Sequence, residues 1–274
     1  VHKKKIYIVG RIAVFQDLLM VKTRPDLAVK KASDKTVVWG DRKNIHWIDT
    51  GSIEHWNYIV TLAKEAYNFG FDELNFDYIR FPSDGDMKDI YFPISEGKNK
   101  AIVLESFFSY LHDQMQGTGA KLSADLFGET TVRTDNDSIG QVLERAMPYF
   151  DYISPMVYPS HYTYNFAGLG DPNKHPYEVV KYCMDEAVKR TIATSTVVSV
   201  MGYEYIASST PKLYTKPAFD KNKMRPWLQD NNYPVTYTPA MVRAQIQATY
   251  DSGLNSWMLW NAGNRYTKEA LIGE

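Results

Sequence analysis

The chain has 274 residues, of which 44% are hydrophobic and 23% charged, and its formal net charge is −1. This length suits one α/β barrel or two small domains, and the composition supplies enough apolar side chains for a large core. The near-neutral charge argues against a nucleic-acid-binding protein, because such proteins carry an excess of basic residues. No apolar run reaches the roughly 18–20 residues of a membrane-spanning helix, so no membrane span is predicted.

Residues that could form disulfides or bind metals are few. Cys183 is the single cysteine, which excludes an intramolecular disulfide. The six histidines show no i, i+4 pair and no His-Glu-x-x-His pattern, so a zinc site is not expected. The sequence also lacks a Gly-x-Gly-x-x-Gly pattern and a phosphate-binding loop. We therefore predict neither a metal nor a cofactor.

Strand-like and helix-like windows alternate along the chain. The predicted strands cover residues 6–15, 72–81, 121–127, 152–158, 224–229 and 256–261. The predicted helices run from a Ser52 cap to Gly70, over 99–116, near 138–150, from His175-Pro176, from Thr238-Pro239 and at the C-terminal end. This alternation predicts six parallel βα units in one domain spanning 1–274. Residues 191–222 interrupt it and are expected to form an insertion with its own hairpin or loop.

The most informative segment is Gly-Phe-Asp-Glu-Leu-Asn-Phe-Asp-Tyr-Ile-Arg-Phe-Pro at 70–82. Its aromatic and β-branched residues favour a half-buried strand, and Pro82 cannot donate to a continuing ladder. Asp77 and Arg80 lie near the strand exit, and barrel enzymes keep their catalytic groups at the carboxyl ends of their strands. The alternative is an Asp77–Arg80 pair that only ties down a loop.

Asp125, near the end of the next strand, supplies a second carboxylate. Glycoside hydrolysis needs two carboxyl groups, one as acid and one as nucleophile or base. Neighbouring parallel strands bring their ends together, and Asn75 shares a face with Asp77 as Ser123 does with Asp125. Polar residues are costly on an inner face unless they line a site. We predict Asp77 as nucleophile or base and Asp125 as acid, with Glu129 as the substitute acid if Asp125 is only a buried acceptor.

Aromatic residues are numerous, with 20 Tyr, 12 Phe and 6 Trp. The apolar faces of sugar rings pack on aromatic planes, while phenol and indole edges can form hydrogen bonds. Several aromatic and polar residues follow predicted strand ends and are candidates for sugar binding: Tyr158, His161, Trp227, Gln229, Trp260 and Asn261. Each aromatic residue taken alone is more often part of a core, and Trp227 is the weakest candidate because Pro226 and Leu228 suggest plain packing.

Five motifs occur in order at the predicted strand ends. They are Phe-Asp-Tyr-Ile-Arg-Phe-Pro (76–82), Ser-Ala-Asp-Leu-Phe-Gly (123–128), Tyr-Ile-Ser-Pro-Met-Val-Tyr-Pro-Ser-His-Tyr (152–162), Arg-Pro-Trp-Leu-Gln-Asp (225–230) and Trp-Met-Leu-Trp-Asn-Ala (257–262). With them the chain resembles a bacterial family of glycoside hydrolases with a TIM-barrel fold, long classed as a domain of unknown function. The resemblance covers nearly the whole chain except 191–222. It implies a TIM (β/α)₈-type barrel in which 6–15, with Arg11, resembles the third strand, so the first two strands are expected to precede Val1.

More distantly, the chain is similar to chitinase-like and α-amylase-like barrels. In the α-amylase group the fourth strand ends with a nucleophilic aspartate followed by a basic residue, and the fifth strand bears the acid. Asn75, Asp77 and Arg80 fall at comparable places on the fourth strand, and Asp125 falls at the end of the fifth. The resemblance implies that Arg11, Asn75 and Arg80 contact the substrate.

Two functions follow as hypotheses. The first is a hydrolase of a polysaccharide or envelope glycan, located in the cell envelope or outside the cytoplasm. The second is a non-catalytic carbohydrate-binding or envelope-structural barrel. An enzyme should show two carboxyl groups facing each other across an open groove, whereas a binding protein could have one of them bridged by Arg80 or Arg11. The expected partner is a carbohydrate, and an oligomer is expected if another chain completes the barrel.

Overall fold

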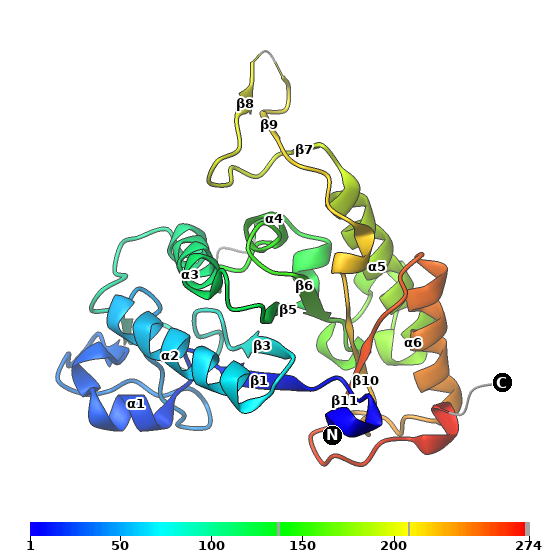
Figure 1. Cartoon of the computed structure of the whole chain (residues 1–274), viewed down its shortest axis with the longest axis horizontal. Coiled ribbons are helices and arrows are strands. Elements are labelled where there is room, and N and C mark those ends of the chain that lie inside the picture. The colour runs from blue at the N-terminus through cyan, green and yellow to red at the C-terminus, as the bar shows by residue number, and fades with distance from the viewer. Residues whose placement is uncertain (136–137, 208, 272–274) are drawn as a thin grey trace. The chain divides into compact units, whose positions relative to one another are not determined.

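A computed structural model describes residues 1–135, 138–207 and 209–271 (Figure 1). The contacts between residues divide the chain into two compact units. The first comprises Val1–Asp125 and Asp135–Asp151, and the second comprises Leu126–Thr134 and Tyr152–Glu274. The single domain expected for the whole chain stays a prediction.

The first unit is built on three parallel strands. β1 (Val9–Ala13) pairs with β3 (Glu73–Asp77), and β3 pairs with β5 (Lys121–Phe127). β5 has the bounds expected from the sequence, whereas β1 is shorter than 6–15 and β3 ends at Asp77 rather than at 81. The register places Arg11, Asn75 and Ser123 opposite one another, so these polar residues share one face of the sheet.

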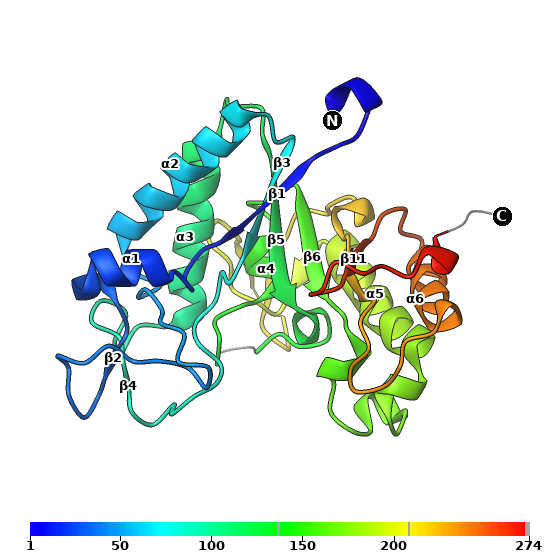
Figure 2. The same cartoon turned by 90° about the horizontal axis from the view of Figure 1, so that it is seen from below.

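Two helices cover the other face of this sheet. α2 (Ile53–Phe69) and α3 (Lys100–Met115) lie side by side next to the strands (Figure 2). Phe76 of β3 contacts the ring of Phe150, which contacts Phe108 of α3 at a centroid distance of 5.2 Å. The apolar and polar residues of β3 therefore alternate between the helix-covered face and the face that carries Arg11.

Both ends of α2 lie where the sequence predicted them. Ser52 is its N-cap, and the Ser52 hydroxyl accepts a hydrogen bond from the His55 N–H at 3.3 Å. Gly70 ends the helix with a φ of 113°, a left-handed conformation that glycine adopts without steric cost. The remaining short elements of this unit are η1 (His2–Lys4), α1 (Leu18–Thr23), η2 (Pro25–Leu27), β2 (Lys30–Lys31), β4 (Ile90–Tyr91) and α4 (Leu143–Ala146).

The helix expected near 138–150 is mostly absent. Only α4 is α-helical there, because Gly140 has a φ of 81° and Val142 at the N-cap position offers no side-chain acceptor. A buried ion pair joins Arg145 of α4 to Glu105 of α3. Tyr149 also donates to Glu105 at 3.4 Å, and burial together with the Glu105 charge raises the pKa of Tyr149 to about 12.

Removing the Glu105 carboxylate should destabilise the protein strongly. Glu105→Ala would leave the Arg145 guanidinium buried without its carboxylate, a change that costs about 3–5 kcal/mol. Urea unfolding of the wild type and the variant measures the loss. The double variant Glu105→Ala/Arg145→Met should recover part of it, and a loss below about 1 kcal/mol in the single variant would contradict a stabilising role for this pair.

The second unit also contains three parallel strands. β6 (Tyr152–Met156) pairs with β10 (Trp227–Gln229), which pairs with β11 (Met258–Trp260). α5 (Pro176–Ile192) and α6 (Pro239–Asp251) pack against each other and begin with the prolines expected from the sequence (Figure 1). This unit also contains the short helices η3 (Gly128–Thr131), η4 (Pro159–His161), η5 (Phe166–Gly168), η6 (Pro172–Lys174), η7 (Lys221–Lys223) and η8 (Lys268–Ala270).

Residues 195–215 contain the hairpin expected in the insertion. β7 (Ser195–Thr196), β9 (Leu213–Thr215) and β8 (Tyr205–Ile206) form a separate antiparallel sheet in that order. The expected terminal helix is represented by η8, and 272–274 lie outside the described residues.

The strand count agrees with the prediction of six βα units. Three parallel strands in each unit make six in the described residues, whereas a TIM barrel closes with eight. The fold class is therefore the TIM-barrel type with fewer barrel strands than a closed barrel. Among the described helices, none is both long enough and apolar enough to cross a membrane.

Candidate active site

The two predicted catalytic aspartates lie at the carboxyl ends of neighbouring strands. Asp77 is the last residue of β3, and Asp125 is the fifth residue of β5. Phe76 is opposite Ala124 in the register, so Asp77 and Asp125 occupy the next level. Both alternate with these apolar residues and therefore share the face that carries Asn75. Strand pairing thus brings together the two carboxylates that the sequence singled out.

A single guanidinium group reaches both carboxylates. Arg11 of β1 forms an ion pair with Asp77 through Nη2 and Oδ2, and its Nε lies 4.0 Å from Oδ2 of Asp125. Burial acts to lower the pKa of Arg11, but the charge and hydrogen bond of Asp77 and the charge of Asp125 raise it overall. Because one guanidinium contacts both, the carboxyl groups lie within the roughly 10 Å that glycoside hydrolysis allows.

Arg80 anchors the loop after β3. Its Nη1 donates to the carbonyl of Phe81 at 3.0 Å, and its guanidinium lies over Trp47 and Tyr78, 4.8 Å and 5.5 Å from the ring centroids. Burial lowers the pKa of Arg80, against the raising effect of the Asp77 charge. Trp47 was not among the predicted site residues, because it lies in a polar loop without a repeating pattern.

Asn75 connects the two strands below the aspartates. Its side chain is fully buried, and Nδ2 donates to Oδ1 of Asp125 at 2.8 Å and to the hydroxyl of Ser123 at 3.0 Å. Oδ1 of Asn75 has no hydrogen-bond partner in the described residues. The amide therefore orients Asp125, and the predicted contact of Asn75 with the substrate stays a prediction.

Gln141 connects β5 to the loop that follows β3. The sequence did not predict this role, because a helix was expected at this position. Its Nε2 donates to the carbonyl of Asp125 at 3.1 Å and to the carbonyl of Ile79 at 3.2 Å. All three residues are buried.

Gln141→Leu should therefore destabilise the protein. It would leave two buried carbonyl groups short of a donor, at about 1–3 kcal/mol for each carbonyl. Urea unfolding measures this loss. Gln114→Leu, at an exposed position of α3, is the matched control and should stay within about 0.5 kcal/mol of the wild type. Equal stability of the two variants would show that the Gln141 contacts do not hold the strand ends.

Glu129, the substitute acid, lies in the second unit in η3. Its side chain is 43% exposed, and Oε2 lies 4.0 Å from Nη1 of Arg133. A solvent-accessible glutamate four residues from an arginine is also common at surface positions without a catalytic role. The structure therefore leaves Glu129 as the reserve candidate.

The predicted aromatic residues form two pairs in the second unit. Trp227 and Trp260 meet edge to face at a centroid distance of 5.9 Å, and both are half-buried. They lie on the sheet face opposite Leu259, which packs on the apolar cluster of α6. Tyr158 and His161 meet edge to face at 5.0 Å, and partial desolvation lowers the pKa of His161 although the residue as a whole is exposed.

The two predicted amide residues are used within the protein. Gln229 is buried, accepts a hydrogen bond from the Ser160 hydroxyl at 2.8 Å and donates to the carbonyl of Tyr233 at 2.6 Å. Asn261 donates to the carbonyls of Asp230 and Arg265. Sugar binding by either amide would require breaking these contacts, and their predicted role stays a prediction.

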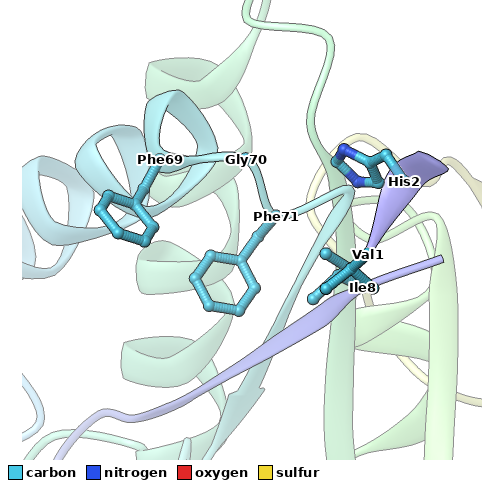
Figure 3. A pocket seen from close by; sticks show the side chains of 6 residues that line it. All are labelled: Val1, His2, Ile8, Phe69, Gly70 and Phe71. Atoms are coloured by element: carbon cyan, nitrogen blue, oxygen red, sulfur yellow. The ribbon is translucent and has the colours of Figure 1, made fainter. Parts of the chain in front are cut away.

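A pocket with a volume of about 280 Å³ lies next to Ile8 and Phe71, and Figure 3 shows the residues that line it. Its lining is mainly apolar and consists of Val1, His2, Ile8, Phe69, Gly70 and Phe71. Ile8 and Phe71 precede β1 and β3, so the pocket is at the amino ends of the strands whose carboxyl side carries Asp77. The described residues contain no group of three or more His, Cys, Asp or Glu side chains that could hold a metal ion.

Comparison with solved structures places the fold among TIM-barrel glycoside hydrolases. The glycoside hydrolase domain of PgaB (BpsB) from Bordetella bronchiseptica is 12% identical, with a TM-score of 0.57 over 94% of this chain and 71% of that one. The α-galactosidase TtGalA from Thermus thermophilus is 11% identical, with a TM-score of 0.52 over 98% of this chain and 46% of that one. The class is thus a TIM-barrel-type domain with paired carboxylates at adjacent strand ends.

The chain belongs to the family described as "Putative glycosyl hydrolase domain", whose model matches residues 1–266. A hypothetical protein from Ruminiclostridium thermocellum is 37% identical over 45% of this chain and 60% of that one, with a TM-score of 0.40. The chain therefore spans less than two thirds of the Ruminiclostridium and Thermus proteins. None of the curated proteins compared with the sequence matches it.

Proposed function

We propose that this protein hydrolyses glycosidic bonds in a polysaccharide or envelope glycan, with Asp77 as nucleophile or base and Asp125 as acid. The observation that carries the proposal is the pair of carboxylates at the carboxyl ends of β3 and β5, both within reach of Arg11. Membership in a glycosyl hydrolase family supports the reaction class. The substrate class and the residue roles are our inference from the site.

The Arg11–Asp77 ion pair fits a nucleophile or base. Such a group must face the anomeric carbon or the attacking water, and the ion pair with Arg11 holds the Asp77 carboxylate in place at the strand end. The acid must instead deliver a proton to the leaving oxygen, and Asp125 is the second carboxyl group, at the end of the neighbouring strand, that could flank the same glycosidic bond.

The same ion pair is the observation that favours a non-catalytic binding protein. In that alternative Arg11 neutralises Asp77, and the buried Asp125 serves only as an acceptor for Asn75. Trp227 and Trp260 would contribute sugar binding in either case.

A glycan panel with product analysis separates the two functions. We expect reducing-end release from at least one polysaccharide, and NMR of the first-formed anomer would assign retention or inversion. Sugar binding by calorimetry without release from any glycan would favour the binding protein. An extracytoplasmic location is part of the proposal, and fractionation of the producing cells tests it.

A further inference from the structure

The residue that follows Asp77 has an unusual backbone conformation. Tyr78 has a φ of 53°, in the left-handed region, where bulky residues are rare and cost of the order of 1–2 kcal/mol relative to right-handed conformations. This conformation ends β3 at Asp77, although 78–81 continue an aromatic and β-branched run. Backbone strain of this kind persists where surrounding contacts enforce it, and it clusters at functional sites.

Contacts on both sides of Tyr78 enforce this conformation. The Val14 N–H donates to the carbonyl of Asp77 at 2.9 Å, and the Phe15 N–H donates to the carbonyl of Tyr78 at 3.3 Å. The ring of Tyr78 meets Trp47 nearly edge to face, with centroids 5.8 Å apart. The chain leaving β1 therefore fixes the peptide groups before and after the strained residue.

The planar peptide group between Asp77 and Tyr78 places the Tyr78 N–H against the preceding carboxylate. This N–H donates to Oδ1 of Asp77 at 2.6 Å, while Arg11 pairs with Oδ2. Each carboxylate oxygen thus has its own donor, one from the backbone and one from a side chain. The guanidinium of Arg11 lies 5.9 Å from the centroid of the Tyr78 ring, so Tyr78 also contacts the second donor.

We propose that Tyr78 is a positioning residue for Asp77. Its left-handed backbone lets the carbonyls of Asp77 and Tyr78 both accept from the chain leaving β1, and the peptide group held in this way fixes the plane of the Asp77 carboxylate. This inference rests on the proposed hydrolase function for its kinetic consequence. The N–H keeps Oδ1 occupied, so Asp77 can present only the remaining lone pairs to a sugar or a water molecule. A fixed carboxylate needs no reorientation in the reaction, whereas a displacement of about 1 Å can cost 10²-fold in rate.

Three substitutions separate the backbone of Tyr78 from its ring. Tyr78→Phe keeps both the ring and the left-handed conformation. Tyr78→Gly removes the ring but adopts a positive φ without cost, and Tyr78→Val removes the ring and disfavours a positive φ strongly. We expect kcat to fall less than about 10-fold in both Tyr78→Phe and Tyr78→Gly. Tyr78→Val should lose about 100-fold or more in kcat with little change in KM.

Equal losses of kcat in Tyr78→Gly and Tyr78→Val would overturn the proposal, because they would assign the effect to the ring. Wild-type kcat in Tyr78→Val would overturn it as well. If Tyr78→Val does not fold, Tyr78→Ala takes its place, since alanine also disfavours the left-handed region. A role in stability alone would lower the melting temperature and leave kcat of the folded enzyme unchanged.

Crystal structures of the wild type and of Tyr78→Val test the inference independently of turnover. We expect the Asp77 carboxylate to rotate in Tyr78→Val and its Oδ1 to lose the N–H donor. An unchanged carboxylate would refute positioning by Tyr78 even if the enzyme is active. A wild type that cleaves no glycan would refute the hydrolase function, and the carboxylate orientation would still decide the role of Tyr78.

Discussion

Replacing Asp77 by asparagine is expected to lower kcat by roughly 10³-fold or more, equivalent to about 4 kcal/mol of barrier. The substitution is nearly isosteric and removes the charge that would attack the anomeric carbon, activate water or stabilise an oxocarbenium-like transition state. Folding should survive, because Asp77 lies at a strand end and its partner Arg11 is partly exposed to solvent. Turnover of the best panel substrate and thermal unfolding of both proteins measure the two effects.

Asp113→Asn is the matched control for this prediction, since Asp113 is an exposed carboxylate on α3. It should keep wild-type turnover. Unchanged turnover in a folded Asp77→Asn protein would remove Asp77 from the mechanism, and an unfolded variant would assign it a structural role. The binding-protein alternative predicts no turnover in either protein and a weaker sugar affinity in Asp77→Asn.

The two mechanistic roles of Asp77 can also be separated. In a retaining enzyme, sodium azide should restore turnover of Asp77→Ala with an activated aryl glycoside, because azide attacks in place of the carboxylate. The glycosyl azide should then have a configuration opposite to that of the substrate and of the normal product. In an inverting enzyme Asp77 activates a water molecule. In that case no glycosyl azide with a configuration opposite to that of the normal product would form.

The sequence predicted the strands of this fold better than the contacts of the site. Residues 121–127 form β5 as expected, because alternating apolar residues there face a helix-covered side. β3 stops four residues early, since nothing in a single sequence marks Tyr78 as left-handed. Of the helix expected near 138–150, only α4 is α-helical. Gln141 lies before α4 and donates hydrogen bonds to the carbonyls of Ile79 and Asp125.

The candidate catalytic pair could be predicted because strand order and side-chain alternation place Asp77 and Asp125 together. Their partners could not be predicted in the same way. Arg11 reaches both carboxylates only because β1 pairs with β3 in a register that the sequence does not encode locally. Gln229 is the last residue of its strand, as Asp77 is, yet its amide is used by contacts with Ser160 and Tyr233 that arise from tertiary packing.

The dependence of the rate on the leaving group is the measurement that identifies the acid. Asp125→Asn should lower kcat by roughly 10²–10⁴-fold on a natural glycan, whose leaving alkoxide needs a proton. The loss should be far smaller on a 2,4-dinitrophenyl glycoside, because that leaving group departs as a stable anion without protonation. The fold should tolerate the change, since an amide oxygen at position 125 can still accept from Nδ2 of Asn75.

Glu129→Gln is the decisive comparison for this prediction. If Asp125 is the acid, Glu129→Gln should show nearly wild-type kcat on both substrates, because Glu129 then takes no part in proton transfer to the leaving group. The reverse pattern, with the leaving-group effect confined to Glu129→Gln, would make Glu129 the acid and Asp125 a buried acceptor for Asn75. The burial of Asp125 does not exclude it as the acid, since catalytic hydrogen bonds often tighten only when substrate is bound. The two variants measured on two substrates therefore assign the proton donor by chemistry rather than by position.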